Sequence, residues 1–149
     1  MKSRGFGLLD LMIAVVVLSL LAAVAVPSYK QFVVRAKNAK AIGDIGSISI
    51  QIDKFRLNNN QQLPAALSDL PMDIPLDPWG TPYQYLVMAG KVTSGAARKD
   101  GKLVPVNSDY DLWSYGNDGD SASPLTANVS RDDIVRANNG AFIGLGEDY

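Results

Sequence analysis

Four aspartates lie within twelve residues of one another: Asp109, Asp111, Asp118 and Asp120. Carboxylates at this density suit calcium, which takes six to eight oxygen ligands from carboxylates, carbonyls and water on a loop that curls around the ion. Asp111 and Asp118 lie seven residues apart, one before and one within a tight turn predicted at 116–119, so both can face one ion. The spacing does not match the EF-hand pattern, and Asp and Asn favour turns without any metal. From spacing alone, a plain acidic turn and a calcium site both stay open.

The chain has no histidine and no cysteine. Their absence excludes Ser-His-Asp and Cys-His nucleophilic mechanisms, Cys/His zinc sites and disulfide bridges. A hydrolase would need paired carboxylates or a Ser-Lys pair, and the four aspartates are candidates for metal-assisted hydrolysis. The formal net charge is −1 and there is no basic stripe with interleaved aromatics, so no nucleic-acid partner is predicted.

A separate acidic residue, Asp10, is the lone charge in a run of 21 residues from Phe6 to Val26. As a helix this run would be about 30 Å long, which is enough to cross the hydrocarbon of a bilayer. Lys2 and Arg4 precede it, which predicts a cytoplasmic N-terminus and an exported remainder. A conventional cleaved signal is the rival interpretation, although its apolar region is shorter, ~7–15 residues. A carboxylate inside hydrocarbon is costly, so Asp10 either stays at the interface or serves a function.

One long helix is predicted to follow from this apolar run. Apolar residues recur every three or four positions from Tyr29 to Phe55, which indicates an amphipathic continuation. The whole element is expected to run from Phe6 to about Leu57. Pro27 has no amide proton and is expected to kink or loosen the helix.

The remaining chain reads as short strands and turns. Alternating residues predict strands at 83–87 and 110–115, and an edge strand that contains a proline at 103–106. The pattern after Ser130 predicts a short helix at 131–138, with that serine as its N-cap. The last residues are expected to fray.

The stretch GFGLLDLMIAVVVLSLLAAVAVPSY resembles the class III signal and first helix of type IV pilins and pseudopilins. Gly5, Phe6 and Asp10 match the spacing of that family, and Pro27 matches its helix proline. The resemblance implies that a prepilin peptidase cleaves after Gly5 and methylates the amino group of Phe6. The family usually has Glu where this chain has Asp10, which is one methylene shorter.

Two later stretches, DPWGTPYQY at 77–85 and DLWSYGNDG at 111–119, resemble the major pseudopilins of type II secretion systems. Asp133 followed by Ile134 is a third match. The resemblance implies an α+β fold of the type IV pilin kind, in which a long N-terminal helix packs on a small antiparallel sheet with a loop-rich C-terminal region. It also implies a leader at 1–5, a transmembrane and filament-core helix at 6–29 and a head at 30–149.

The same resemblance implies a structural calcium ion in the head. Its ligands would be the carboxylates of Asp111 and Asp118 and the backbone carbonyl of Ser108, with Asp109 and Asp120 as further candidates. A metal staple would suit a small head that lacks cysteine.

The function implied is that of a structural subunit, not an enzyme. Copies of the chain would form a helical pseudopilus that drives protein secretion, with minor pseudopilins, an inner-membrane assembly platform and the prepilin peptidase as partners. Before assembly the chain would cross the inner membrane once, with its head in the periplasm. Asp10 would then pair with the Phe6 amine of a neighbour. The alternatives are a type IV pilus or competence pilin and, remotely, a membrane-anchored metal-dependent hydrolase.

Overall fold

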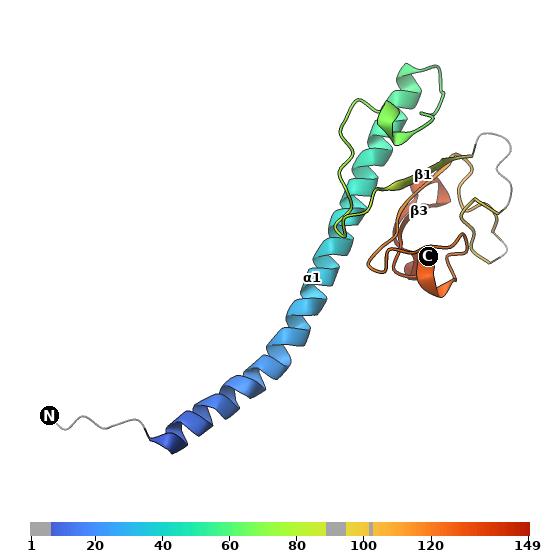
Figure 1. The fold of residues 1–149 in the computed structure, drawn as a ribbon. Helices are drawn as coiled ribbons and strands as arrows, with labels where there is room; N and C mark the ends of the chain where they lie inside the picture. Colours follow the sequence, from blue (N-terminus) through green and yellow to red (C-terminus); the bar gives the residue numbers. More distant parts are fainter. Residues whose placement is uncertain (1–6, 89–94, 102) are drawn as a thin grey trace. The chain divides into compact units, whose positions relative to one another are not determined.

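The computed structural model describes residues 7–88, 95–101 and 103–149, so the predicted processing site at Gly5 and Phe6 lies outside the described residues. The chain divides into two compact units, Met1–Ala36 and Lys37–Tyr149. The predicted limit of the head at residue 30 stays a prediction. Figure 1 shows the N-terminal helix, the strands and the loops that connect them.

Helix α1 spans Leu8–Asn58, which confirms the single long helix expected from the apolar periodicity. The helix is continuous through Pro27, and in the same turn the Ser28 hydroxyl donates to the Val24 carbonyl over 2.9 Å. At its end, Asn60 and Gln61 adopt positive φ angles of 52° and 65°. This left-handed backbone stops the helix, and the Gln61 amide returns to the Arg56 carbonyl over 2.9 Å.

The head holds one antiparallel sheet of four strands in the order β1-β2-β3-β4. Neighbouring strands in the sequence are neighbours in the sheet, and a single three-residue 3₁₀ turn, Leu67–Asp69, interrupts the loop before the first of them. The strand bounds are Gln84–Val87 for β1, Tyr110–Ser114 for β2, Ile134–Ala137 for β3 and Phe142–Leu145 for β4.

Alternation along the strands gives the sheet two different faces. One face packs on the C-terminal part of α1, and the largest cluster of buried apolar residues lies there. The opposite face carries Trp113 and Val135 and is covered by loop residues, among them Val106 and Leu125. The buried members of the first cluster are Ala41, Ile45, Ile48, Ile52, Leu70, Tyr83, Tyr110, Leu112 and Ile134.

The predicted strands at 83–87 and 110–115 are confirmed as β1 and β2, but three expectations for the later chain are wrong. Residues 134–137 are the buried strand β3 rather than a helix, because β-branched Ile134 and Val135 pair with β2 and β4. Ser130 caps no helix; its hydroxyl bonds the backbone of Ala122 instead.

The C-terminal residues do not fray, since 142–145 form β4 along β3. The predicted edge strand at 103–106 is not formed, although all four of its residues are described. Leu103 makes one bridge to Asp100, and the Val106 amide donates to the Arg98 carbonyl. Whether a segment forms a strand depends on whether another strand is available to pair with it, and local sequence does not specify that.

Candidate functional site

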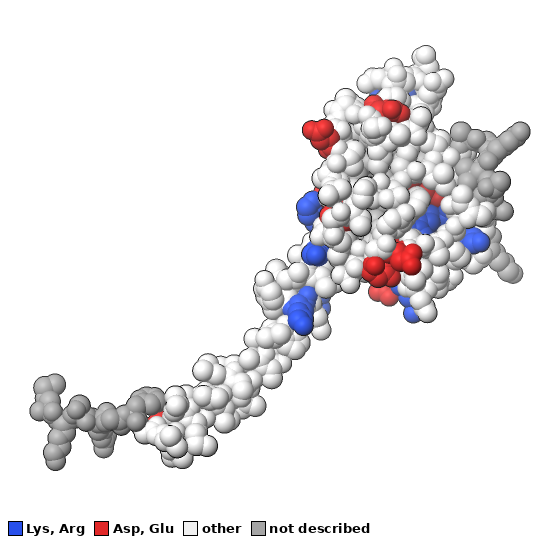
Figure 2. All heavy atoms as spheres, viewed as in Figure 1, with Lys and Arg blue, Asp and Glu red and all other residues white. Residues whose placement is uncertain are grey.

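The first candidate surface is the apolar N-terminal part of α1. Its large apolar side chains are open to the surroundings, with exposed fractions between 49% at Val17 and 80% at Leu8. Among the described residues, α1 is the one helix long and apolar enough to cross a membrane. Figure 2 shows this stretch as an almost uncharged surface. An apolar surface of this extent needs a lipid or protein cover.

Asp10 lies in the first turn of α1, where its Oδ2 accepts a hydrogen bond from the Gly7 amide over 3.1 Å. Gly7 also accepts the first intrahelical bond, from Leu11. A carboxylate three residues into a helix that bonds the N-cap amide is one half of a capping box, and it suits the positive end of the helix dipole. Within one subunit, Asp10 therefore caps the helix while its carboxylate stays exposed.

The DPWGTPYQY stretch is held together by the Asp77 carboxylate. Its Oδ1 accepts from the amides of Trp79 (3.0 Å) and Thr81 (2.8 Å). Its Oδ2 accepts from the hydroxyls of Thr81 and Ser114, both over 2.5 Å. Burial raises the pKa of Asp77, but the bonds from Ser114 and Thr81 outweigh burial and leave that pKa below its ordinary value. The motif is thus a structural clamp between this turn and β2.

Asp111 is fully buried on the sheet face opposite α1. Its Oδ2 accepts from the Arg98 amide over 2.7 Å, and its Oδ1 accepts from the side-chain amide of Asn107 over 2.7 Å. Burial, only partly offset by these donors, raises the pKa of its carboxyl. Each oxygen of Asp111 therefore already faces an N–H donor of the protein.

The other predicted calcium ligands have different surroundings. Asp118 is exposed and its Oδ1 accepts from the Asp120 amide, while the Asp120 Oδ1 accepts from the Ser121 amide. Ser108 is exposed as well and is tied by its amide and hydroxyl to Asn139. The bonds of Asp118 and Asp120 reach one or two residues along the chain and are typical of turns, whereas Ser108 and Asn139 are 31 residues apart.

Asp109 is engaged in an ion pair with a nearly buried arginine. The Arg136 guanidinium reaches both carboxylate oxygens of Asp109, over 2.9 and 2.7 Å, and its carbon lies 3.9 Å from the centre of the Tyr110 ring. Burial raises the pKa of Asp109, but Arg136 and the Tyr110 amide lower it further than burial raises it.

The described residues do not fit the predicted calcium set. A calcium ion on Asp111 would have to displace the Arg98 and Asn107 donors from a carboxylate with no exposed surface. Over residues 7–88, 95–101 and 103–149, no group of three or more acidic side chains is placed to hold a metal. Calcium binding stays a prediction of the resemblance.

No sequence pattern points to three residues that organise this part of the head: Arg98, Asn107 and Arg136. Each is buried and polar, and each bonds a carboxylate at least four residues away. Asp133, expected from the sequence as a family match alone, is fully buried and paired with Arg98 over 2.6 Å. Only sequence covariation between distant positions could have linked these partners.

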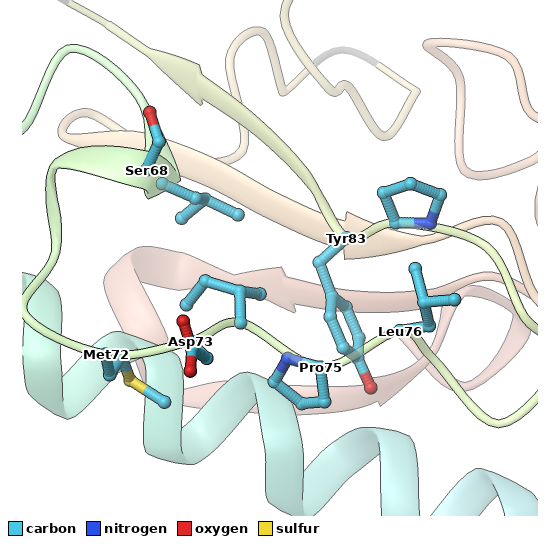
Figure 3. A pocket seen from close by; sticks show the side chains of 9 residues that line it. Ser68, Met72, Asp73, Pro75, Leu76 and Tyr83 are labelled. Carbon is cyan, nitrogen blue, oxygen red and sulfur yellow. The ribbon is translucent and has the colours of Figure 1, made fainter.

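Figure 3 shows an open pocket beside the proline-rich loop 71–82, which precedes β1, with Met72, Pro75 and Leu76 on its wall. Among its lining residues, Asp73 and Tyr83 are the titratable ones. The Tyr83 hydroxyl donates a hydrogen bond to the Asp44 carboxylate of α1 over 2.8 Å. Burial, and to a lesser extent this bond, raises the pKa of Tyr83. The pocket therefore pairs no acid with a base.

Comparison with known proteins gives a consistent family. No family model and no solved structure matches the chain. The chain is 33% identical over 138 residues to a type II secretion system core protein G of Pseudomonas aeruginosa, covering 78% of this chain and 97% of that protein. It is 31% identical over 139 residues to the protein of that name in Escherichia coli K12, covering 80% and 85%. With the N-terminal helix and the four-stranded head, these matches place the chain in the family of type II secretion system core protein G, the major pseudopilins.

Proposed function

We propose that this chain is the repeating structural subunit of a type II secretion pseudopilus. The observation that carries the proposal is the exposed apolar surface of α1 in a chain that belongs to the major pseudopilin family. The relatives reported above are named as secretion proteins, and no observation on the described residues favours the pilus, competence or hydrolase alternatives.

The apolar surface explains two successive states of such a subunit. Before assembly, lipid covers the helix, which is long and apolar enough to cross the inner membrane once. The Lys2 and Arg4 side chains hold the N-terminus on the cytoplasmic side and leave the head in the periplasm. After assembly, helices of other copies replace the lipid, through a head-to-tail contact that generates a helical filament.

Asp10 sets the register of this contact. A prepilin peptidase cuts after Gly5 and methylates Phe6, which creates a cationic amine at the start of the helix. The exposed Asp10 carboxylate of one subunit then bonds the Phe6 amine of its neighbour, so that neither charge stays alone in apolar surroundings. The remaining partners are minor pseudopilins and the inner-membrane assembly platform, whose motor supplies the energy for extraction.

The test is an Asp10→Ala variant expressed with the other secretion components. Membrane insertion stays normal, since the variant makes the apolar run more apolar, although it also removes the cap bond from the Gly7 amide. The yield of sheared filaments falls about tenfold or more, because a contact worth about 1.4 kcal/mol changes an association constant tenfold. Ser19→Ala is the matched control, since it removes another exposed polar group whose bond to Val16 is internal to the helix.

Wild-type filament yield from Asp10→Ala would contradict the assembly role of that carboxylate. The mass of the membrane-extracted chain tests the processing step separately. It should equal residues 6–149 plus one methyl group, and an uncut leader would contradict cleavage after Gly5.

A further inference from the structure

The Arg98 side chain is 3% exposed, which is unusual for a guanidinium. Its Nη2 donates to the Asp133 carboxylate over 2.6 Å and to the Ser121 hydroxyl over 2.7 Å. Its Nη1 donates to the Ala122 carbonyl. The three acceptors lie 23 to 35 residues away from Arg98 in the sequence.

Arg98 also contacts the sheet. Its backbone amide donates to Asp111 of β2 over 2.7 Å, and its guanidinium carbon lies 4.6 Å from the centre of the Trp113 ring. One residue thereby joins β2, the loop around Ser121 and the residue directly before β3. The loop near Arg98 is further fixed to the chain after Ser121 by the Lys99 amide, which donates to the Ser123 carbonyl.

The acceptors around the Arg98 guanidinium are a carboxylate, a hydroxyl and a backbone carbonyl. These are the oxygen types that calcium binds, and they come from separate loops that a metal staple would join. A guanidinium is a cation with several N–H donors in a fixed planar arrangement, so it can bond acceptors that come from different loops. Asp133 Oδ2 is already shared between Arg98 and the Ser121 hydroxyl.

We propose that the Arg98 guanidinium is the cation that joins the acidic C-terminal loops to the sheet, in the structural role that the resemblance assigns to calcium. Asp133, which the predicted ligand set did not include, is its carboxylate partner. Asp111 is then satisfied by N–H donors and needs no metal. The head is expected to hold its structure without calcium.

The experiment uses the full chain in non-ionic detergent micelles and follows unfolding by tryptophan fluorescence. The two tryptophans of the sequence, Trp79 and Trp113, both lie in the head. Millimolar calcium and excess chelator are compared on the unaltered chain, and the expected difference in Tm is below about 1 °C, because a ligand that does not bind the folded state does not stabilise it. A saturable rise in Tm with calcium would overturn the proposal. In that case the Asp133 Oδ1 atom would be the first candidate calcium ligand, because it is buried and has no hydrogen-bond partner among the described residues.

Variants supply the second readout. Arg98→Gln should lower the Tm by more than about 10 °C, because it leaves a buried carboxylate without its cation. Arg131→Gln is the matched control on an exposed arginine of the same region and should leave the Tm within about 2 °C. If Arg98→Gln does not fold, Arg98→Lys retains the charge without the fork and should fold with an intermediate Tm. An unchanged Tm in either Arg98 variant would contradict the proposal.

Discussion

The two units of the chain treat apolar and polar groups in opposite ways. In residues 7–36 the apolar side chains are exposed, and hydrogen bonds such as Gly7 to Asp10 join near neighbours along the helix. In residues 37–149 the apolar side chains form clusters, and polar bonds span the sequence: Ser114 to Asp77 covers 37 residues. The first unit exposes apolar surface that needs a lipid or protein cover, whereas the second buries most of its large apolar side chains within itself.

This contrast separates assembly from stability. A change on the exposed helix should alter what covers it while leaving the head folded. A change in a buried cluster should unfold the head while leaving the exposed apolar part of α1 as it is. Variants that differ only in burial or in charge environment can test this division.

The largest loss of unfolding free energy in this series is expected from Ile48→Ala. Ile48 is 1% exposed in the cluster between α1 and the sheet, so its truncation leaves a cavity and costs about 2–5 kcal/mol. Ile50→Ala, on the same helix, removes the same atoms from a residue that is 56% exposed and should stay within about 0.5 kcal/mol of the parent. Urea unfolding of the micelle-bound chain, followed by tryptophan fluorescence, measures both. Equal losses would abolish the distinction between the two faces of α1.

Asp77→Asn should come next, at about 1–3 kcal/mol. The substitution replaces an acceptor of four hydrogen bonds by an amide whose NH₂ faces the hydroxyls of Thr81 and Ser114. Asp73→Asn is the control, because Asp73 is exposed at the pocket of Figure 3. The same unfolding curves test it, and a loss below 0.5 kcal/mol for Asp77→Asn would show that the clamp is dispensable.

Acidification should reduce the difference in unfolding free energy between the parent chain and Asp77→Asn. The pKa of Asp77 is lower in the folded chain than its ordinary value of 3.8. The ionised clamp therefore stabilises the head above that value, and this contribution is lost as the pH falls below about 4 and through the folded pKa. Unfolding free energies of both chains between pH 3 and pH 7 measure it. A difference that grows on acidification would reverse the sign assigned here.

The smallest effect is expected from Lys40→Ala. The Lys40–Asp44 pair measures 2.7 Å, but the lysine side chain is 56% exposed and solvent screens the pair. We expect a loss of about 0.5 kcal/mol or less, and Asp44 keeps its bond to the Tyr83 hydroxyl. A loss near that of Asp77→Asn would mean that surface and buried charges contribute alike in this head.

Several features could be predicted from sequence because they depend on neighbours along the chain. The apolar run and its periodic continuation specify α1, and the alternating stretches specify β1 and β2. The turn at 116–119 follows from its glycines, since Gly116 and Gly119 have φ angles of 68° and 73°. The family assignment also came from local motifs, which the relatives confirm.

The tertiary structure decided the rest. Residues 134–137 form a strand because β2 and β4 lie on either side of them, and a periodic pattern of four residues cannot express that. Spacing alone left the aspartates open between a plain acidic turn and a calcium site. In the structure, Asp109 pairs with Arg136 while Asp111 faces Arg98 and Asn107. Spacing along the chain does not specify these partners, because Arg98 and Arg136 come from segments 13 and 27 residues away from the aspartates they bond.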